Sequence, residues 1–483
     1  MSAHEYLVDA RPLIGASRPD TTSLGRRDHI NPASGEAQAS IFIGGAAEIE
    51  CALAAAVEGQ RRWHDIGPAR RRDCLVRLAD MVEREVDWFK QVAALEVGTP
   101  LAVGGAALAL SWMRYYAGWA DKIEGSVTDP IGASGIAYSQ HEPIGVIGVI
   151  IPWNSPLVAI SMTAILALAG GNAVVLKPPT QTPFAALRFG ELALEAGFPE
   201  GVLNIVPGDA EAGEALISDW RCGKISFTGG ETVARSVMRQ AAEALKPVAL
   251  ELGGKSANII FDDADIDAAA QMAATCSMVV ATGQGCVLPT RAYVHDSIFD
   301  DFVAKVAKFA AAFPIGDPLD PATLVGPVIT EAAAQRIMGV IDRAAKDSGG
   351  TLVAGGKRGA GALAKGAFVE PTVFADVAHD SSLAREEVFG PVLAIMRFKE
   401  ESEVLAKAND SRFGLGAYLH TNDLKRAHRM AAGLQAGAVA VNGMLPMAPN
   451  LPFGGFKQSG FGREGGKPGL EEFMHIKQVM IHL

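Results

Sequence analysis

A cysteine between glycines is the residue of this chain whose type and setting most favour chemistry. Cys286 ends "GQGC", directly after the apolar run "AATCSMVVATG" (273–283), which predicts a buried helix. A buried thiol usually serves as a small apolar side chain. Glycine lacks a Cβ, however, so the backbone beside this thiol can approach a ligand and point amide N–H groups at it. The setting suggests a nucleophile, which needs a base, an oxyanion donor and shelter from water.

Two polar residues at the ends of apolar runs supply the other groups that such a thiol needs. Glu251 stands in "LELGGKS", and Asn154 stands in "IPWNSP". Alone, the glutamate is as well explained by a structural carboxylate, and the asparagine by local turn chemistry. Together with Cys286 they form a nucleophile, a general base and an amide donor to an oxyanion. The combination predicts covalent catalysis through a thiol.

Alternating strands and helices in the middle of the chain explain how such distant residues meet. Between 144 and 251, short β-branched runs such as "GVIGVII", "NAVVLK" and "KISF" alternate with helical segments. This alternation predicts right-handed βαβ units and a parallel sheet. Ligands bind beyond the carboxyl ends of the strands in such sheets. The edge that these ends form carries Asn154, Lys177, Thr180, Gly229, Gly230 and Glu251.

The flanking regions complete an α/β organisation. The first third of the chain reads as helices with apolar residues at spacings of three and four, followed by an exposed strand at "GIAYSQHEP" (135–143). A second set of strands and helices follows "ELGGKS", and its first helix is expected to reach residue 282. The Gly- and Pro-rich stretch 444–466 is too irregular for a core element. Long ordered loops of this kind are often functional.

The turn "FTGGETVAR" (227–235) has two interpretations. A glycine pair between a strand and a helix leaves free N–H groups and a helix dipole that favour an anion. An ordinary strand-to-helix turn explains the same residues. The G-x-G-x-x-G fingerprint is absent at this position. Gly283 and Gly285 give half of that fingerprint, but they follow a helical pattern, and we reject them as a phosphate loop.

Composition argues against several classes of protein. A chain of 483 residues is expected to form two or three domains. Its net charge of −11 argues against a nucleic-acid partner, and the basic run at 61–73 reads as a solvated helix face. The cysteines lack CxxC spacing and the histidines lack HExxH, so neither a disulfide framework nor a metal site is expected. With no signal-peptide pattern and no sufficiently long apolar run, we expect a cytoplasmic protein with no membrane partner.

The motifs around these residues carry a resemblance over essentially the whole chain. They are "PWNSP", "KPPTQTP", "FTGG", "ELGGKS", "GQGC", "EEVFGPV", "NDSRFGLGAYLHT" and "PFGGFKQSGFGREGG". Their order and spacing are those of the aldehyde dehydrogenase superfamily, and "YYAGWADK" (115–122) also matches. The chain therefore resembles a non-acylating, NAD(P)-dependent aldehyde dehydrogenase.

The resemblance implies a role for each motif residue. Cys286 matches the catalytic cysteine, Glu251 matches the general base, and Asn154 matches the side chain that completes the oxyanion hole with the N–H of the cysteine. The implied reaction oxidises an aldehyde to the carboxylic acid through a thiohemiacetal and a thioester. No metal ligand is implied. The positions that match cofactor contacts are Pro152, Trp153, Lys177, Thr180, Gly229, Gly230, Leu252, Glu387 and Phe389.

The resemblance also implies an α/β fold of three parts. A Rossmann-like cofactor domain would comprise residues 1–123 and 144–252, and an α/β catalytic domain residues 253–454. A small β oligomerisation flap would comprise 124–143 and 470–483. The flap would join 124–143 to the C-terminal strand "KQVMIHL" of a neighbouring subunit, in a homodimer or a homotetramer.

Departures from the family pattern bear on the cofactor. Members often carry Glu at the position of Thr180, Ser at Gly230 and Gly at Ala234. A glutamate at position 180 would repel a 2′-phosphate, whereas Lys177, three residues away, can pair with one. We therefore expect NADP⁺ to be accepted, with NAD⁺ also used.

The residues aligned with the substrate tunnel favour an uncharged aldehyde. No Arg or Lys flanks Cys286, where relatives that act on acidic semialdehydes often place a carboxylate anchor, and Arg291 and Arg463 belong to general family motifs. Relatives often carry bulky aromatic residues at two of the tunnel positions, Ser155 and Met162, so we expect a wide tunnel for a medium or large aromatic or aliphatic aldehyde. The tunnel positions are Ser155, Val158, Ala159, Met162, Val287, Met447 and Phe453.

Other functions remain open at this point. The main alternative is a semialdehyde dehydrogenase that acts on a carboxylated substrate. A CoA-acylating relative is less favoured, because Glu251 is present to activate water. Outside dehydrogenases, an inactive structural relative would not need the three catalytic residues, and a cofactor-free cysteine hydrolase would need a histidine partner for its thiol.

Overall fold

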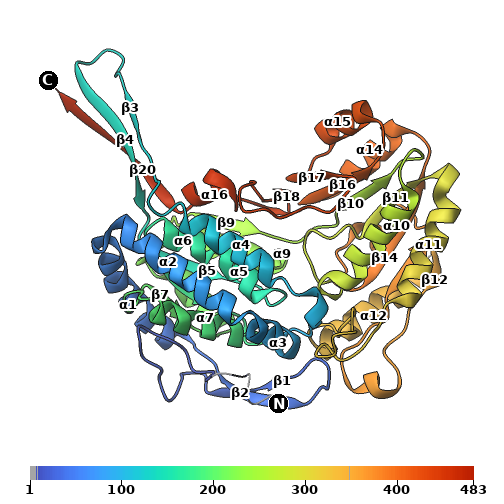
Figure 1. Ribbon diagram of the computed structural model, residues 1–483, viewed down its shortest axis with the longest axis horizontal. Coiled ribbons are helices and arrows are strands. Elements are labelled where there is room, and N and C mark those ends of the chain that lie inside the picture. The colour runs from blue at the N-terminus through green and yellow to red at the C-terminus, as the bar shows by residue number, and fades with distance from the viewer. Residues whose placement is uncertain (1–6, 8, 347–348, 483) are drawn as a thin grey trace.

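The computed structural model describes residues 7, 9–346 and 349–482 and contains two large sheets that stand side by side, each covered by helices (Figure 1). A three-stranded sheet projects from the body, and the C-terminal end of the chain lies at its tip. These features match the predicted α/β class.

The first sheet has six strands in the order β19-β9-β8-β5-β6-β7. Five of them run parallel, and β19 pairs antiparallel with β9. The strands are β5 (Val146–Ile150), β6 (Ala173–Lys177), β7 (Leu203–Ile205), β8 (Cys222–Thr228), β9 (Val248–Glu251) and β19 (Gly460–Phe461). The five residues of β5 are all buried, as expected for a parallel strand covered on both faces.

Alternation along β5 sends its side chains into two separate cores. Val146 and Ile150 pack with α1 (Ala46–Asp65), α8 (Ala210–Ser218) and α9 (Glu231–Glu243). Ile147 and Val149 pack on the opposite face. The helices of that face are α2 (Gly67–Arg84), α3 (Val86–Glu96), α4 (Ala106–Ala117), α5 (Pro156–Met162), α6 (Ala164–Ala169) and α7 (Phe184–Glu195).

The second sheet has seven strands in the order β12-β13-β14-β11-β10-β16-β17, parallel except for the edge strand β12. Its strands are β10 (Ala257–Ile260), β11 (Arg291–His295), β12 (Thr351–Ala354), β13 (Thr372–Ala375), β14 (Val392–Phe398), β16 (Gly416–His420) and β17 (Ala438–Val441). Helices α10 (Ile266–Ala274) and α11 (Phe299–Ala312) cover one face. Helices α12 (Glu331–Lys346), α14 (Glu401–Asn409) and α15 (Leu424–Gly433) cover the other.

Two antiparallel units flank these sheets, in addition to the short antiparallel pair of β15 (Phe413–Gly414) and β18 (Phe456–Lys457). In the projecting sheet, β4 (Gly135–Pro143) lies between β3 (Ser126–Thr128) and β20 (Met474–His482). Its register runs from Met474 opposite Pro143 to His482 opposite Gly135. The second unit is the hairpin of β1 (Arg26–Ile30) and β2 (Ala37–Phe42), which lies at the foot of the first sheet in Figure 1.

The expected strand at 135–143 and the strands at the first sheet are confirmed, and three expectations are wrong. The helix before Cys286 ends at Ala274 and gives way to a wider helical turn at 275–279, so it does not reach residue 282. The first third is not helical throughout, because β1 and β2 precede the helices. The C-terminal strand begins at Met474 rather than at residue 477, and it pairs with β4 of the same chain, whereas a pairing with a neighbouring subunit was expected. The sequence of β1, "RRDHI", is largely exposed and polar, which gives little apolar alternation to detect.

Within the described ranges, no single helix combines the length and the apolar character needed to cross a membrane. The segments 86–96 and 101–117 meet that test only as a pair, and they are bent by 117° relative to each other.

Candidate active site

A cavity of about 200 Å³ lies beyond the carboxyl ends of the first sheet and brings together the three residues singled out for covalent chemistry. Asn154 follows β5, Glu251 ends β9, and Cys286 comes from the segment between α10 and β11. The strand topology therefore places Asn154 and Glu251 as the βαβ argument anticipates, and Cys286 joins them from outside the first sheet. The full lining is Pro152, Trp153, Asn154, Thr228, Gly229, Gly230, Glu251, Leu252, Gly253, Cys286, Glu387 and Phe389.

The segment that carries Cys286 has an unusual backbone. Three successive residues adopt left-handed φ values, with Ala281 at 48°, Thr282 at 52° and Gly283 at 72°. A Cβ at Gly283 would lie 2.3 Å from the carbonyl oxygen of Gly390, so only glycine fits there. Left-handed non-glycine residues are unfavourable, typically by about 1–3 kcal/mol, and need support from surrounding structure. The chain turns sharply here and so presents the thiol to the cavity.

Asn154 is tied to the same segment. Its side-chain Nδ2 donates to the carbonyl oxygen of Gln284 at 2.8 Å. The side chain of Gln284 is buried, and its Oε1 accepts a hydrogen bond from the N–H of Ile329 at 3.0 Å. The amide of Asn154 is thus held beside the backbone of the residue two positions before Cys286. From there it can also donate to the oxygen of a substrate carbon that is bonded to the Cys286 sulfur.

The surroundings of the Cys286 thiol favour its protonated form. Burial, together with the nearby carboxyl groups of Glu387, Glu251 and Glu464, raises the pKa of this thiol to about 12. A nucleophilic thiolate therefore requires a base that removes the proton, or a positive charge that enters the cavity.

Glu251 has the environment of a general base with a raised pKa. It is buried, and Oε2 has no hydrogen-bond partner in the described part of the chain. Burial raises its pKa well above the usual range, and Glu464 adds like-charge repulsion. Glycine at position 454 leaves room for this carboxyl, because a Cβ there would lie 2.8 Å from Oε1.

Glu464 is a buried carboxyl that the sequence reasoning missed. Burial raises its pKa to about 8. Its backbone pairs with that of Phe453, across the loop that was expected to be irregular. The sequence gives no signal for this neighbourhood, because a glutamate in a glycine-rich loop is usually solvated.

Glu387 and Phe389 face the cavity from the second half of the chain. Glu387 Oε1 accepts a hydrogen bond from the N–H of Gly254 at 3.0 Å, and burial raises the pKa of this carboxyl. A Cβ on Gly253 would lie 2.2 Å from Glu387 Oε2. Phe389 adopts a left-handed φ of 51° and meets the ring of Trp153 edge to face, with the ring centroids 5.4 Å apart.

Lys177 and Thr180 lie apart from this cavity, beside the end of β7. Lys177 is buried and Nζ donates to the carbonyl oxygen of Gly208 at 2.6 Å. Burial lowers the pKa of this lysine to about 8. Thr180 donates to Asp209 Oδ1 at 3.0 Å and accepts from Arg27 at 3.3 Å. The sequence did not predict that Arg27 and Asp209 are neighbours of Thr180.

The residues expected to line the substrate tunnel do not belong to the lining of the cavity that contains Cys286. All but Ser155 belong to or pack against one large apolar cluster, against which Cys286 also packs. Asn154, Ser155 and Val158 line a second cavity of about 50 Å³. Lys90 of α3 also lines this cavity, and its Nζ lies 3.4 Å from the exposed carboxylate of Asp87. The residues that flank Cys286 in sequence give no sign of Lys90, because position 90 is far from position 286 along the chain.

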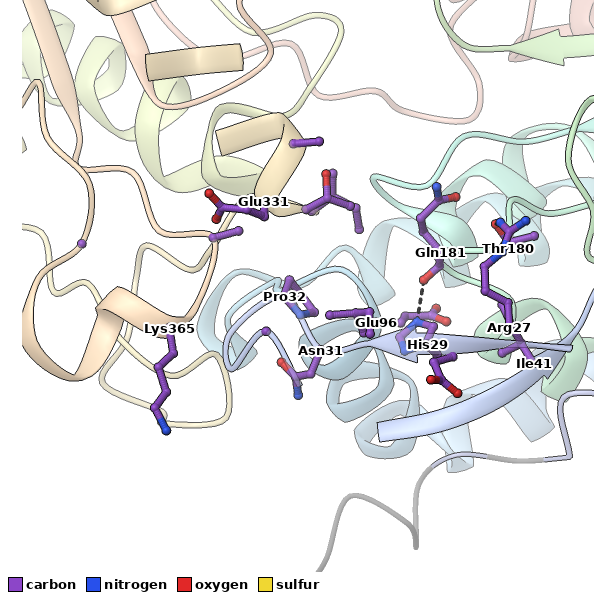
Figure 2. Close-up of a pocket in the computed structure, with 18 of the residues that line it drawn as sticks. Arg27, His29, Asn31, Pro32, Ile41, Glu96, Thr180, Gln181, Glu331 and Lys365 are labelled. Carbon is purple, nitrogen blue, oxygen red and sulfur yellow. Dashed lines mark hydrogen bonds between the residues drawn. The ribbon is translucent and has the colours of Figure 1, made fainter. Parts of the chain in front are cut away.

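A larger cavity, of about 820 Å³, lies elsewhere, between the β1–β2 hairpin and the segments 329–332 and 358–367 (Figure 2). His29 Nε2 lies 2.7 Å from the carbonyl oxygen of Gln181, the hydrogen bond dashed in Figure 2. Glu96 lines the same cavity, and burial raises its pKa to about 8. Thr180 stands at one edge of this cavity beside Arg27.

The chain is similar in sequence and in structure to aldehyde dehydrogenases. The profile of the Aldehyde dehydrogenase family matches residues 20–479. A mitochondrial aldehyde dehydrogenase of Leishmania tarentolae is 41% identical over 455 residues, which are 93% of this chain and 90% of that protein. An NAD⁺ complex of aldehyde dehydrogenase from Bacillus cereus superimposes with a TM-score of 0.95 at 36% identity, covering 99% of this chain and 98% of that one. An E. coli NADP-dependent enzyme has the same TM-score and identity and covers 99% of each chain.

The chain therefore belongs to the aldehyde dehydrogenase family and is an enzyme that oxidises aldehydes to acids.

Proposed function

We propose that Cys286, Glu251 and Asn154 catalyse NAD(P)⁺-dependent oxidation of an uncharged aldehyde through a covalent thioester. The observation that supports this most directly is that the three side chains line one cavity, which also contains the glycine turn and Glu387. The cofactor contacts are those assigned above by resemblance. The similar Bacillus cereus and E. coli enzymes are described with NAD⁺ and NADP respectively.

The residues of the cavity suit a dinucleotide. Helix α9 begins after Gly230, so its first N–H groups and its dipole can receive an anionic phosphate. A Cβ at Gly230 would meet no atom within 4 Å, so the space beside this helix end is open. Glu387 offers a carboxylate to hydroxyl groups of a ribose. When bound, the nicotinamide accepts hydride from the carbon attached to Cys286.

The residues of the chain perform the other steps. The Cys286 thiolate attacks the aldehyde carbonyl carbon and forms a thiohemiacetal. Asn154 Nδ2 and the backbone N–H of Cys286 stabilise the oxyanion, and a donor of this kind is typically worth about 2.7–4 kcal/mol. Loss of hydride leaves a thioester on the cysteine. Glu251 then removes a proton from water, the hydroxide adds to the thioester, and the acid leaves as Cys286 is restored.

The tunnel favours an uncharged substrate of medium or large size. Met162, Val287 and Phe453 are buried in the apolar cluster against which Cys286 packs, and a carboxylate buried among apolar side chains without a partner is costly. Methionine side chains adapt to varied shapes, which suits aromatic and aliphatic aldehydes alike. One observation favours the alternative, a semialdehyde with a carboxylate, because Lys90 lines the cavity next to Asn154.

Turnover of an aldehyde series tests the proposal. We expect kcat/KM to rise from C4 to C8 aliphatic aldehydes, because each buried methylene contributes about 0.8 kcal/mol. Benzaldehyde-type substrates should be used well, and succinic semialdehyde poorly. Formation of reduced cofactor is followed at 340 nm with NAD⁺ and with NADP⁺. A clear preference for succinic semialdehyde would support the alternative, a semialdehyde dehydrogenase. If no aldehyde gave reduced cofactor, the proposal would be wrong.

We also propose the domain division given above, with residues 1–123 and 144–252 holding the cofactor and 253–454 contributing the thiol. The projecting sheet exposes Val127, Ile131 and Ile476, which supports a role in forming a homodimer or a homotetramer. All five cysteines are free, which supports a reducing compartment, the cytoplasm.

A further inference from the structure

We infer that Arg27 and Asp209 set the choice between NAD⁺ and NADP⁺, with Arg27 as the group that receives the 2′-phosphate. This inference rests on the proposed function, which supplies the dinucleotide and the place of its nicotinamide. It concerns the opposite end of the cofactor, and it replaces Lys177 by Arg27 as the phosphate partner.

The strand order fixes where the adenosine must lie. From β5 the chain adds β6 and then β7 on one side, and then crosses to add β8 and β9 on the other. The direction of winding reverses between β5 and β8, and dinucleotides bind across such a switch point. The nicotinamide must reach Cys286, which lies with Leu252 and Glu387 on the β9 side. The adenosine then lies beyond the ends of β6 and β7.

The side chains at those two strand ends form one connected group. Thr180, three residues after β6, donates to Asp209 Oδ1 at 3.0 Å. Arg27 Nη1 lies 2.9 Å from Asp209 Oδ2 and 3.3 Å from Thr180 Oγ1. Figure 2 shows the Arg27 side chain rising from β1 to Thr180. A hairpin far from the sheet in sequence therefore completes the ribose end of the groove.

Lys177 is poorly suited to hold the phosphate. Its residue exposure is 7%, its Nζ already donates to Gly208, and burial lowers its pKa to about 8. By contrast, 54% of the Arg27 side chain is exposed, and its guanidinium contacts Asp209 and Thr180. A guanidinium is always charged and can bind phosphate oxygens through two parallel N–H groups.

The pair has a different use with each cofactor. With NAD⁺, Asp209 accepts a hydrogen bond from the ribose 2′-hydroxyl while Arg27 neutralises the carboxylate. With NADP⁺, the 2′-phosphate and Asp209 repel each other, and Arg27 turns to the phosphate. Arg27 therefore favours NADP⁺ and Asp209 favours NAD⁺, which accounts for the use of both by one site.

Binding of two fragments tests this without turnover. Titration calorimetry of the full enzyme with 2′,5′-ADP and with 5′-AMP isolates the contribution of the 2′-phosphate. We expect Arg27→Met to weaken the binding of 2′,5′-ADP by about tenfold or more and the binding of 5′-AMP by less than about threefold. Arg27→Lys should lie between, because it keeps the charge and loses the paired N–H groups. Asp209→Asn should strengthen the binding of 2′,5′-ADP, because it removes the carboxylate that repels the 2′-phosphate.

The chain offers a matched control in Arg26, the neighbour of Arg27 on β1. Its guanidinium stacks over the ring of Phe42, 4.2 Å from the ring centroid. Arg26→Met should leave the binding of both fragments unchanged. The ratio of kcat/KM for NADP⁺ and NAD⁺ should follow the fragment affinities in each variant, and Thr180→Glu should lower that ratio.

If Arg27→Met weakened the binding of both fragments equally, with an unchanged melting temperature, the inference would be overturned. Arg27 would then be a positioning residue of β1. Unchanged 2′,5′-ADP affinity would overturn it as well. These outcomes differ from failure of the proposed function, in which the unmutated enzyme would bind neither fragment and reduce neither cofactor.

Discussion

The side-chain Nδ2 of Asn154 lies 2.8 Å from the carbonyl oxygen of Gln284, two residues before Cys286. This bond joins the end of β5 in the first sheet to the segment that leads into the second. The left-handed residues 281–283 and the bond from Ile329 to Gln284 hold that segment from its other side. Both sheets therefore hold the Asn154 amide beside the segment that carries Cys286.

Removal of this amide should slow the chemical step. We expect Asn154→Ala to lower kcat by about 10²–10³, because one preorganised oxyanion donor is lost. Asn154→Asp should be worse, because a carboxylate would repel the oxyanion. Single-turnover formation of reduced cofactor measures the effect, with thermal unfolding as the check on folding. A loss below about threefold in Asn154→Ala would remove this residue from the oxyanion hole.

The roles of the thiol and the base can be separated in time. Cys286→Ala should abolish turnover, because no covalent adduct forms. Glu251→Gln should keep a burst of reduced cofactor and lose steady turnover, because the oxidation precedes the hydrolysis that needs the base. Stopped-flow absorbance at 340 nm resolves the burst. Near-normal steady turnover in Glu251→Gln would contradict the assignment of the base.

The pH dependence of hydrolysis should report on two carboxyl groups. Glu251 activates water only when deprotonated, and its pKa lies well above the usual range because of burial and Glu464. The rate of thioester hydrolysis should therefore rise with pH and level off above that raised pKa. Glu464→Gln removes the like charge, so the rising limb should move to lower pH.

A neighbouring glutamate serves as the control for this shift. The Glu471 side chain is more exposed than those of Glu251 and Glu464, and it forms an ion pair with Lys467. Glu471→Gln should leave the limb in place. An unchanged limb in Glu464→Gln would mean that the two buried groups do not interact during turnover.

Local patterns predicted the parallel sheet and the positions of the candidate catalytic residues Asn154 and Glu251, because strand ends carry short, recognisable motifs. The same patterns missed β1, whose sequence is polar and whose partner strand is half exposed. That omission hid Arg27, because nothing near Thr180 in sequence reveals a side chain that arrives from residue 27. Lys90 and Glu464 were missed for the same reason, since each reaches the site through tertiary packing alone.

A buried lysine behind the active site should make stability depend on pH. Lys255 is 1% exposed, and its Nζ has no hydrogen-bond partner among the described residues. Burial, with Arg291 nearby, lowers its pKa to about 7. The folded state therefore loses this proton near pH 7, whereas the unfolded state keeps it up to a pKa of about 10.4. Between those values the unfolded state binds more protons, so stability rises with pH.

Lys255→Met removes this dependence. We expect its melting temperature to exceed that of the unmutated enzyme most at and below pH 7, and the gap to narrow as pH rises toward 10. The change in the gap corresponds to at most about 1.4 kcal/mol per pH unit. Lys308→Met, at an exposed position of α11, should show no such trend. A constant gap across this range would mean that Lys255 is charged in the folded enzyme throughout.

Lys90 decides between the two substrate classes. It lines the cavity beside Asn154 and Ser155, and its only ion pair in the described residues is the 3.4 Å contact with Asp87. If the tunnel serves uncharged aldehydes, Lys90→Met should change kcat/KM for octanal and for benzaldehyde by less than about twofold, since an exposed charge contributes little. Succinic semialdehyde should remain a poor substrate in both enzymes. A loss of about tenfold confined to the semialdehyde, through KM, would instead identify Lys90 as a carboxylate anchor. Lys308→Met again serves as the matched control, because it removes one lysine charge at a site on the other sheet.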